Sequence, residues 1–216
     1  MLRGKARTDL IKCANDLAFC AIQAPDSREG TIGMQDFARA SALFGFDVLA
    51  EEYGLPWKAL LKEVGLPENT LENLQGLVSY RRFLALLELS ANRANEPLFG
   101  MKLGLRQGVT VFGPILYLLN NASTVGEALS ELRQYFHLHM GAAHVEVSSY
   151  GDKIQLAYRV LDPKQPGINH GAELALGVGR KLLKTLMGSN WQPHPMLLEH
   201  QAQASMQAYR DLLGIT

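Results

Sequence analysis

The hydrophobic period changes once along this chain, and that change constrains the fold more than any other feature. Up to about Leu138 the apolar residues recur at helical spacing, whereas from His144 they alternate with polar residues. The first pattern predicts helices with one buried face, and the second predicts strands with one buried face. The order predicts an α+β fold: N-terminal helices, then a β-hairpin or small antiparallel sheet packed with helices.

Apolar stripes, caps and turn residues predict a series of helices before the hairpin. Gly54 and Gly65 each precede Leu-Pro, which we interpret as two helix-to-helix corners rather than a repeat, because the spacing does not continue. Thr124-Val125-Gly126-Glu127 predicts a capping box in which Glu127 reaches back to the Thr124 amide. The helices are expected at 35–53, from Pro56 onward, from Ser79 to about Asn95, at 98–103, at 115–119 after Pro114, and from Thr124 to about Leu138.

The second half of the chain is expected to hold the strands. Val145 and Val147 mark one strand, Tyr150-Gly151-Asp152 forms the turn, and 154–160 returns as the other strand. A lone hairpin is marginal, so it must lie on helices or join further strands. After it we expect a helix at 172–186 ended by Gly188, a short strand at 195–199 and a last helix at 204–213.

Composition excludes several classes of protein. Among 216 residues, 21 Lys and Arg balance 21 Asp and Glu, whereas autonomous binding to duplex DNA favours a basic excess. The length fits about one domain. Cys13 and Cys20 form no CxxC pair, and we interpret them as reduced thiols. Since no targeting or membrane-spanning segment is convincing, the chain is expected to be soluble and cytoplasmic.

The first 33 residues differ from the rest. A mixed-charge opening leads into the polar stretch 24–30, which is typical of a linker. We therefore divide the chain into an unassigned N-terminal extension, 1–33, and a domain at 34–216. Met34 begins that domain, so an upstream-extended start or a fused remnant is one hypothesis for the extension.

Several motifs follow one another in a fixed order along this domain. They are Gly54-Leu55-Pro56, Val64–Pro67, Phe112–Leu119, Asn121–Leu129, the Tyr150-Gly151-Asp152 turn, Glu173-Leu174-Ala175, Gly188–Pro193, Leu198-Glu199-His200 and Tyr209–Gly214. As a set they resemble the N-terminal, effector-sensing (arabinose-binding-like) domain of AraC/XylS-type bacterial transcriptional regulators.

The resemblance implies a function and partners. Members of that family join this sensor through a linker to a C-terminal domain of two helix-turn-helix motifs, and they often dimerise. The chain ends at Thr216, before the position at which the family would continue into those motifs. DNA is therefore expected as a partner only through a helix-turn-helix domain absent from this chain. A small-molecule effector and a homodimer are the other expected partners, and no membrane is expected.

The residues carry no signature of a metal site or a catalytic site. No HExxH or H-x₃-H spacing occurs, and His137 and His139 would point in different directions on a helix. No G-x-S-x-G motif or phosphate-binding loop is present. We expect no metal, no cofactor and no enzymatic activity. A stand-alone small-molecule-binding protein or an uncharacterised enzyme is the alternative.

Ligand sensing is the function that remains. Polar and aromatic residues gather where the helices meet the hairpin and where the 172–186 helix begins, and binding pockets combine apolar walls with a few polar groups. We predict a small, neutral or weakly polar ligand between the hairpin and this helix, contacted by Tyr135, His137, His139, His170 and Glu173. The stripes Tyr80, Phe83, Leu87 and Leu182, Leu186 are either a dimer interface or ordinary core.

Overall fold

The computed structural model describes residues 17–22, 36–150, 153–188, 190–192 and 196–214. Short turns of 3₁₀-helix are labelled η. The elements are β1 (Leu17–Ile22), β2 (Ala38–Arg39), η1 (Ala40–Leu43), α2 (Phe46–Glu52), α3 (Trp57–Glu63), η2 (Thr70–Glu72), β3 (Leu77–Val78), α4 (Tyr80–Ala94), α5 (Phe99–Gln107), η3 (Gly108–Phe112), α6 (Pro114–Asn121), α7 (Val125–Tyr135), η4 (Phe136–Leu138), β4 (Ala143–Tyr150), β5 (Lys153–Val160), α8 (Ile168–Met187), β6 (Met196–Leu198) and α9 (Met206–Leu213).

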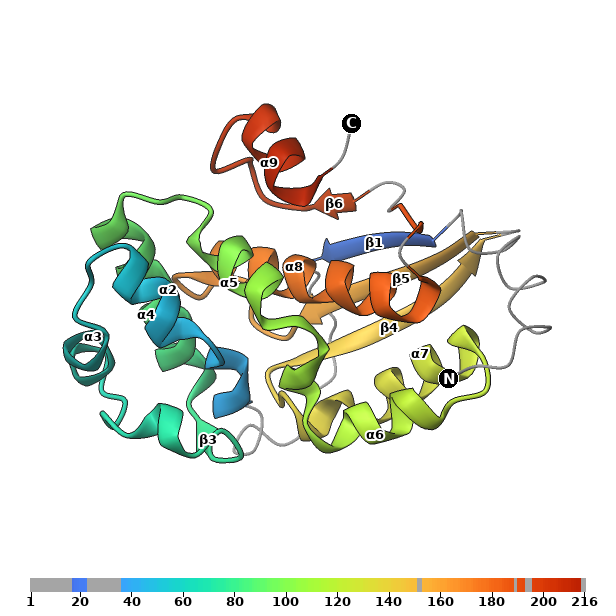
Figure 1. Cartoon of the computed structure of the whole chain (residues 1–216), viewed down its shortest axis with the longest axis horizontal. Helices are drawn as coiled ribbons and strands as arrows, with labels where there is room; N and C mark the ends of the chain where they lie inside the picture. Colours follow the sequence, from blue (N-terminus) through green and yellow to red (C-terminus); the bar gives the residue numbers. More distant parts are fainter. Residues whose placement is uncertain (1–16, 23–35, 151–152, 189, 193–195, 215–216) are drawn as a thin grey trace.

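The predicted hairpin is the start of a larger sheet. β4 and β5 pair antiparallel, with Val145 opposite Tyr158, and two parallel strands extend them in the order β4-β5-β1-β6. α8 packs against this sheet, α6 and α7 lie beside β4, and β6 and α9 lie at the far edge (Figure 1). The α+β class is confirmed, and so is the expectation that the hairpin joins further strands.

β1 comes from the segment for which the sequence predicted no structure. Its residues pair with β5 from Leu17 opposite Ile154 to Ile22 opposite Arg159, and β6 pairs on its other side. A short apolar run has no local signal for a pairing partner so far along the chain, so the sequence did not reveal the strand. Cys20 lies on β1, while Cys13 and the 24–30 linker lie outside the described residues. The division at residue 34 stays a prediction.

The first expected helix is shorter than predicted, because long-range hydrogen bonds take its N-terminal half. Residues 38–43 form β2 and η1, in which the Arg39 amide donates to the His139 carbonyl oxygen at 2.9 Å. The Ser41 amide donates to the Leu74 carbonyl oxygen at 2.8 Å. Gly45, at φ 74°, follows this segment as the N-cap of α2, which begins at Phe46. Tertiary pairing has overridden the helical spacing.

The other helix ends follow local chemistry closely. Thr124 Oγ1 accepts from the Glu127 amide at 3.0 Å, as predicted, but the Glu127 carboxylate accepts from the Ser123 amide at 2.6 Å instead of the Thr124 amide. Pro56 is the N-cap of α3 rather than its first helical residue. The corner at Gly65 leads into the 3₁₀ turn η2 rather than an α-helix, and the helix expected at 98–103 extends over Phe99–Gln107 as α5. The turn residues Gly151 and Asp152, and Pro195 before β6, lie outside the described part of the chain.

α5 and α8 cross at a distance that only glycine permits. A Cβ at Gly100 would overlap the His170 carbonyl oxygen, and one at Gly104 would overlap the Leu174 carbonyl oxygen. From the opposite side, a Cβ at Gly177 would lie 2.8 Å from the Leu105 amide nitrogen. Glycine lets backbones approach this closely because it has no side chain. The glycines of 100–104, which fit no phosphate loop, are therefore packing residues.

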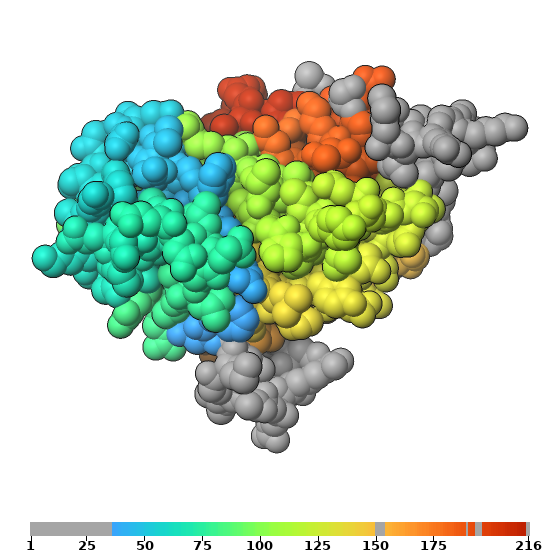
Figure 2. Space-filling model, turned by 60° about the horizontal axis from the view of Figure 1, so that its bottom comes forward, coloured from blue at the N-terminus to red at the C-terminus, as the bar shows by residue number. Residues whose placement is uncertain are grey.

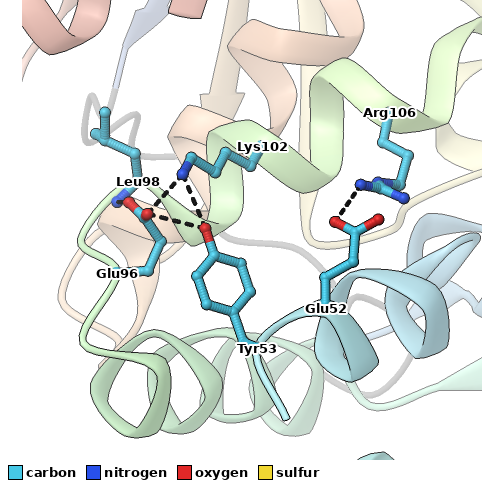
Figure 3. A network of polar contacts seen from close by, with 6 residues as sticks. All are labelled: Glu52, Tyr53, Glu96, Leu98, Lys102 and Arg106. Carbon is cyan, nitrogen blue, oxygen red and sulfur yellow. Dashed lines mark hydrogen bonds and ion pairs between the residues drawn. The ribbon is translucent and has the colours of Figure 1, made fainter. Parts of the chain in front are cut away.

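The outer side of α5 is tied to α2 by charged groups (Figure 3). Lys102 Nζ donates to Glu96 Oε2 at 2.6 Å and to the Tyr53 hydroxyl at 2.8 Å. Arg106 Nη2 donates to Glu52 Oε2 at 2.6 Å. Burial alone would raise the pKa of Glu96, but the hydrogen bonds from Lys102 and the Leu98 amide hold it below its usual value. These contacts fix α5 from the side opposite α8.

Two stripes considered for a dimer interface are mostly buried inside this chain. Tyr80, Phe83 and Leu87 on α4 and Leu182 on α8 are each at most 1% exposed, and Leu186 is partly buried. They belong to the core between α4, α8 and their neighbours. A second copy cannot reach the four buried side chains, so the interface interpretation was wrong for them. On the face seen in Figure 2, the blue-to-teal first part of the described chain meets the yellow-green middle part.

Substitution of Gly104 by Ala tests the helix crossing. The added methyl group meets the Leu174 backbone, which cannot rotate away, so we expect a loss of about 3 kcal/mol in the free energy of unfolding. Urea denaturation measures it. Gly126→Ala on α7 is the matched control, because its Cβ would meet only Thr124 Oγ1 at 3.9 Å. The control should be neutral or slightly stabilising. Equal effects of the two changes would contradict the crossing.

Truncation tests the role of β1. A chain that begins at Met34 lacks β1, which leaves one edge of β5 unpaired and removes the neighbour of β6. Unpaired edges lower stability and promote aggregation. We expect a lower urea midpoint and concentration-dependent light scattering for this chain. A chain beginning at Ala14 keeps β1 and should behave like the full chain. If the Met34 chain is as stable as the full chain, β1 is dispensable.

Candidate functional site

A cavity lies between the hairpin and α8, where the sequence predicted a ligand site. We call it the α8 cavity. Its volume is about 50 Å³, where roughly 10–15 Å³ holds one water molecule. Its walls are mostly apolar, and η3, η4 and the end of α5 also contribute to its lining. The main apolar side chains come from β4, β5 and α8: Val145, Leu156, Leu174, Val178 and Leu182.

Gln107, the last residue of α5, contributes one polar group to this cavity. The side chain is 4% exposed, and its Nε2 donates to the Ala42 carbonyl oxygen at 2.6 Å. Its Oε1 has no hydrogen-bond partner among the described residues. The crossing of α5 and α8 determines where α5 ends, and so where Gln107 lies. Sequence reasoning missed this residue, because nothing local distinguishes it from other helix-end glutamines.

His139 contributes a second polar group. It follows η4 directly, and its carbonyl oxygen is held by the Arg39 amide. The side chain is 4% exposed, and Nδ1 has no partner in the described part of the chain. Burial, with a smaller contribution from the Arg39 charge, lowers the pKa of His139 to about 4. The imidazole is therefore neutral near pH 7.

Tyr158 is the third polar residue at the cavity, and its hydroxyl is already engaged. It donates to Met140 Sδ at 3.0 Å and lies 3.3 Å from the Tyr80 hydroxyl. Burial raises the pKa of both phenols, so both stay protonated. Rings surround this corner: Phe136 meets Phe112, His139 and Tyr158 edge to face, with centroids 5.7–6.5 Å apart. The cavity is thus an aromatic corner with few free polar atoms.

The five predicted ligand residues do not converge. Only His139 lines the α8 cavity. Tyr135 is partly buried against the core, and His137 is exposed, with Nδ1 3.0 Å from the Gln134 carbonyl oxygen. His170 and Glu173 do not line the cavity and belong to a second cluster, in contact with the C-terminal segment.

Glu173 is the centre of that cluster and is fully buried. Its carboxyl accepts a hydrogen bond from the Tyr209 hydroxyl on α9, and Tyr209 in turn accepts from the Gln203 amide at 3.1 Å. His200 Nε2 lies 3.9 Å from Glu173 Oε1. Burial raises the pKa of Glu173 to about 7, and the Tyr209 hydrogen bond opposes that rise only in part. Burial lowers the pKa of nearby His170. The cluster joins α8 to α9.

In the part of the chain that the structure describes, no three His, Cys, Asp or Glu side chains lie close enough together to share a metal ion. None of the helices described combines the length and apolar composition needed to cross a membrane.

An α+β domain with a mostly apolar cavity and isolated buried polar atoms has the features of a small-molecule-binding domain. Over residues 54–216 the chain matches the family model described as the arabinose-binding domain of AraC transcription regulators, N-terminal. The chain belongs to this family. It is 27% identical over 180 residues to the HTH-type transcriptional regulator VirS of Mycobacterium tuberculosis, in both strain CDC 1551 / Oshkosh and strain H37Rv. The alignment covers 82% of this chain and 53% of each relative, so the chain spans about half their length.

The pH dependence of unfolding tests the burial of Glu173. Its pKa is raised in the folded state, so the folded protein keeps a proton that the unfolded chain loses as pH rises from about 4.5 to about 7. Stability attributable to Glu173 is therefore present at low pH and is lost across that window, by about 3 kcal/mol. Urea unfolding at pH 5 and pH 8 should show that Glu173→Gln removes this loss.

Comparing Glu173→Gln with the wild type separates the pH dependence due to Glu173 from that due to the histidines. His139 and His170 have lowered pKa values and shift stability in the opposite direction, but they do so equally in both proteins. Glu68→Gln, at an exposed position, should retain the wild-type pH dependence. Identical pH dependence in wild type and Glu173→Gln would contradict the raised pKa.

Proposed function

We propose that this chain is the effector-sensing domain of an AraC-type transcriptional regulator and that a small molecule binds in the α8 cavity. The observation that carries this proposal is that two residues lining an apolar cavity, Gln107 and His139, each keep a buried polar atom, Oε1 and Nδ1, without a hydrogen-bond partner among the described residues. A buried polar atom without a partner costs about 1–3 kcal/mol, which a ligand could offset by forming the hydrogen bond. Family membership supports the same function.

The ligand contacts proposed from the sequence are revised by this geometry. His139 is retained and Gln107 is added, because both line the cavity. Tyr135, His137, His170 and Glu173 stay predictions, which the geometry does not favour as direct contacts. The family model is named for arabinose, but that name does not determine the ligand of this chain.

The partners follow from the family. Relatives are described as HTH-type transcriptional regulators, and we propose that the sensor controls a helix-turn-helix DNA-binding domain in the cytoplasm of a bacterium. We propose no enzymatic reaction. A homodimer is also part of the proposal, and its interface must lie outside the buried residues of the α4 and α8 stripes.

A cavity-filling substitution tests ligand sensing. Ala175 lines the cavity from α8, and Ala175→Leu would occupy part of its volume. We expect a compound from a thermal-shift panel of sugars, amino acids, fatty and aromatic acids, and phenols to stabilise the wild type. At a free ligand concentration one hundred times its Kd, the free energy of unfolding rises by about 2.7 kcal/mol. Ala175→Leu should lose most of this shift.

Thr185→Leu is the matched control, since Thr185 is exposed on the same helix and does not line the cavity. It should keep the wild-type shift. The proposal fails if no compound stabilises the wild type at saturation, or if Ala175→Leu responds as the wild type does.

A further inference from the structure

The lining of the α8 cavity restricts the charge of its ligand. Among the described residues that line it there is no Lys, Arg, Asp or Glu, and burial keeps His139 neutral. An ion placed here would lose its hydration without meeting an opposite charge, which is costly in an apolar environment. Carboxylates, amines and phosphates are therefore disfavoured, and a neutral molecule is favoured.

The free hydrogen-bonding capacity restricts the number of polar groups on the ligand. Gln107 Oε1 accepts hydrogen bonds only, and His139 Nδ1 either accepts or donates according to its tautomer. The Tyr158 hydroxyl is already used by Met140 and Tyr80. These side chains can serve one hydroxyl group or two, but not the several hydroxyl groups of a pentose.

The shape of the walls favours a ring. Phe83, Phe112, Phe136 and Tyr158 line the cavity, and several of these rings already meet edge to face. A further aromatic ring extends such packing favourably, because ring edges and faces carry opposite partial charges. The cavity volume of about 50 Å³ is below the roughly 150 Å³ of an engineered cavity that binds benzene, so the walls must move to admit even a single ring, and larger ligands are disfavoured.

We propose that the α8 cavity binds a neutral phenol-type molecule, a single aromatic ring whose hydroxyl group donates to Gln107 Oε1 and faces His139 Nδ1. This inference rests on the proposed function and narrows it to a ligand class. The aromatic ring packs among Phe112, Phe136 and the α8 side chains. Gln107 and His139 thereby determine specificity for the hydroxyl group.

A matched set of four compounds tests the ligand class on the wild-type chain. Phenol is the probe, toluene lacks the hydroxyl group, benzoate adds a charge, and L-arabinose replaces the ring with a polyhydroxylated one. Binding is followed by the NMR shifts of methyl groups on Leu156, Val178 and Leu182, which line the cavity. We expect saturable shifts with phenol, about tenfold weaker binding of toluene, and no binding of benzoate or arabinose at the same concentrations.

Variants locate the hydroxyl group. Gln107→Leu and His139→Leu should each weaken phenol binding about tenfold and leave toluene binding nearly unchanged. Ser41→Ala is the matched control. It removes a buried hydrogen bond to the Val111 carbonyl oxygen beside the cavity, but Ser41 does not line it. The control should bind phenol as the wild type does. Because the two variants are independent, poor folding of one leaves the other as the test.

The outcomes separate this inference from the proposed function. If arabinose or benzoate shifts the cavity methyl groups more strongly than phenol, the ligand class is wrong while ligand sensing stands. If toluene binds as tightly as phenol, Gln107 and His139 do not select a hydroxyl group, and the inference again fails alone. Absence of phenol binding also overturns it. Ligand sensing itself is then judged by the wider panel with Ala175→Leu.

Discussion

The close crossing of α5 and α8 is the constraint on which the rest of the structure depends. Gly100 and Gly104 face the carbonyl groups of α8 directly, so the two helix axes are held at one distance and one register. Because Gln107 ends α5 one turn beyond this contact, the crossing also determines where its amide enters the cavity. The Lys102 and Arg106 contacts on the outer side of α5 oppose any rotation of the helix. The lining of the cavity is thus a consequence of backbone packing.

α8 separates two different chemical environments. Leu174, Val178 and Leu182 face the apolar cavity, while Glu173 is buried against α9 and the segment before it. Successive residues of an α-helix point in different directions, so Glu173 and Leu174 lie on different faces of α8. Anything that displaces α8 therefore acts on both environments at once. This arrangement makes α8 the shared wall between the cavity and the C-terminal segment.

Local signals predicted the parts of the fold that local chemistry determines. The Thr124 cap, the hairpin and the helix ended by Gly188 could be predicted because each depends on residues within a few positions. β1 and the 38–43 segment could not, since their hydrogen-bond partners lie from about 30 to more than 130 residues away. The site divides in the same way. A site between the hairpin and α8 was predicted from polar and aromatic residues near their ends, of which only His139 lines the cavity, whereas the contribution of Gln107 depends on tertiary packing.

The buried polar groups oppose the stability that the core provides. Gln107 and His139 each keep one atom without a partner, and Glu173 is buried as a carboxyl group with a raised pKa. Each such group costs about 1–3 kcal/mol, a large fraction of the roughly 5–15 kcal/mol that stabilises a typical domain. Apolar residues of similar size would avoid this cost at all three positions. Gln107 and His139 line the cavity and keep their unpartnered atoms at a loss of stability, which is the pattern expected where polar atoms serve a site and not folding, whereas Glu173 lies away from the cavity and joins α8 to α9.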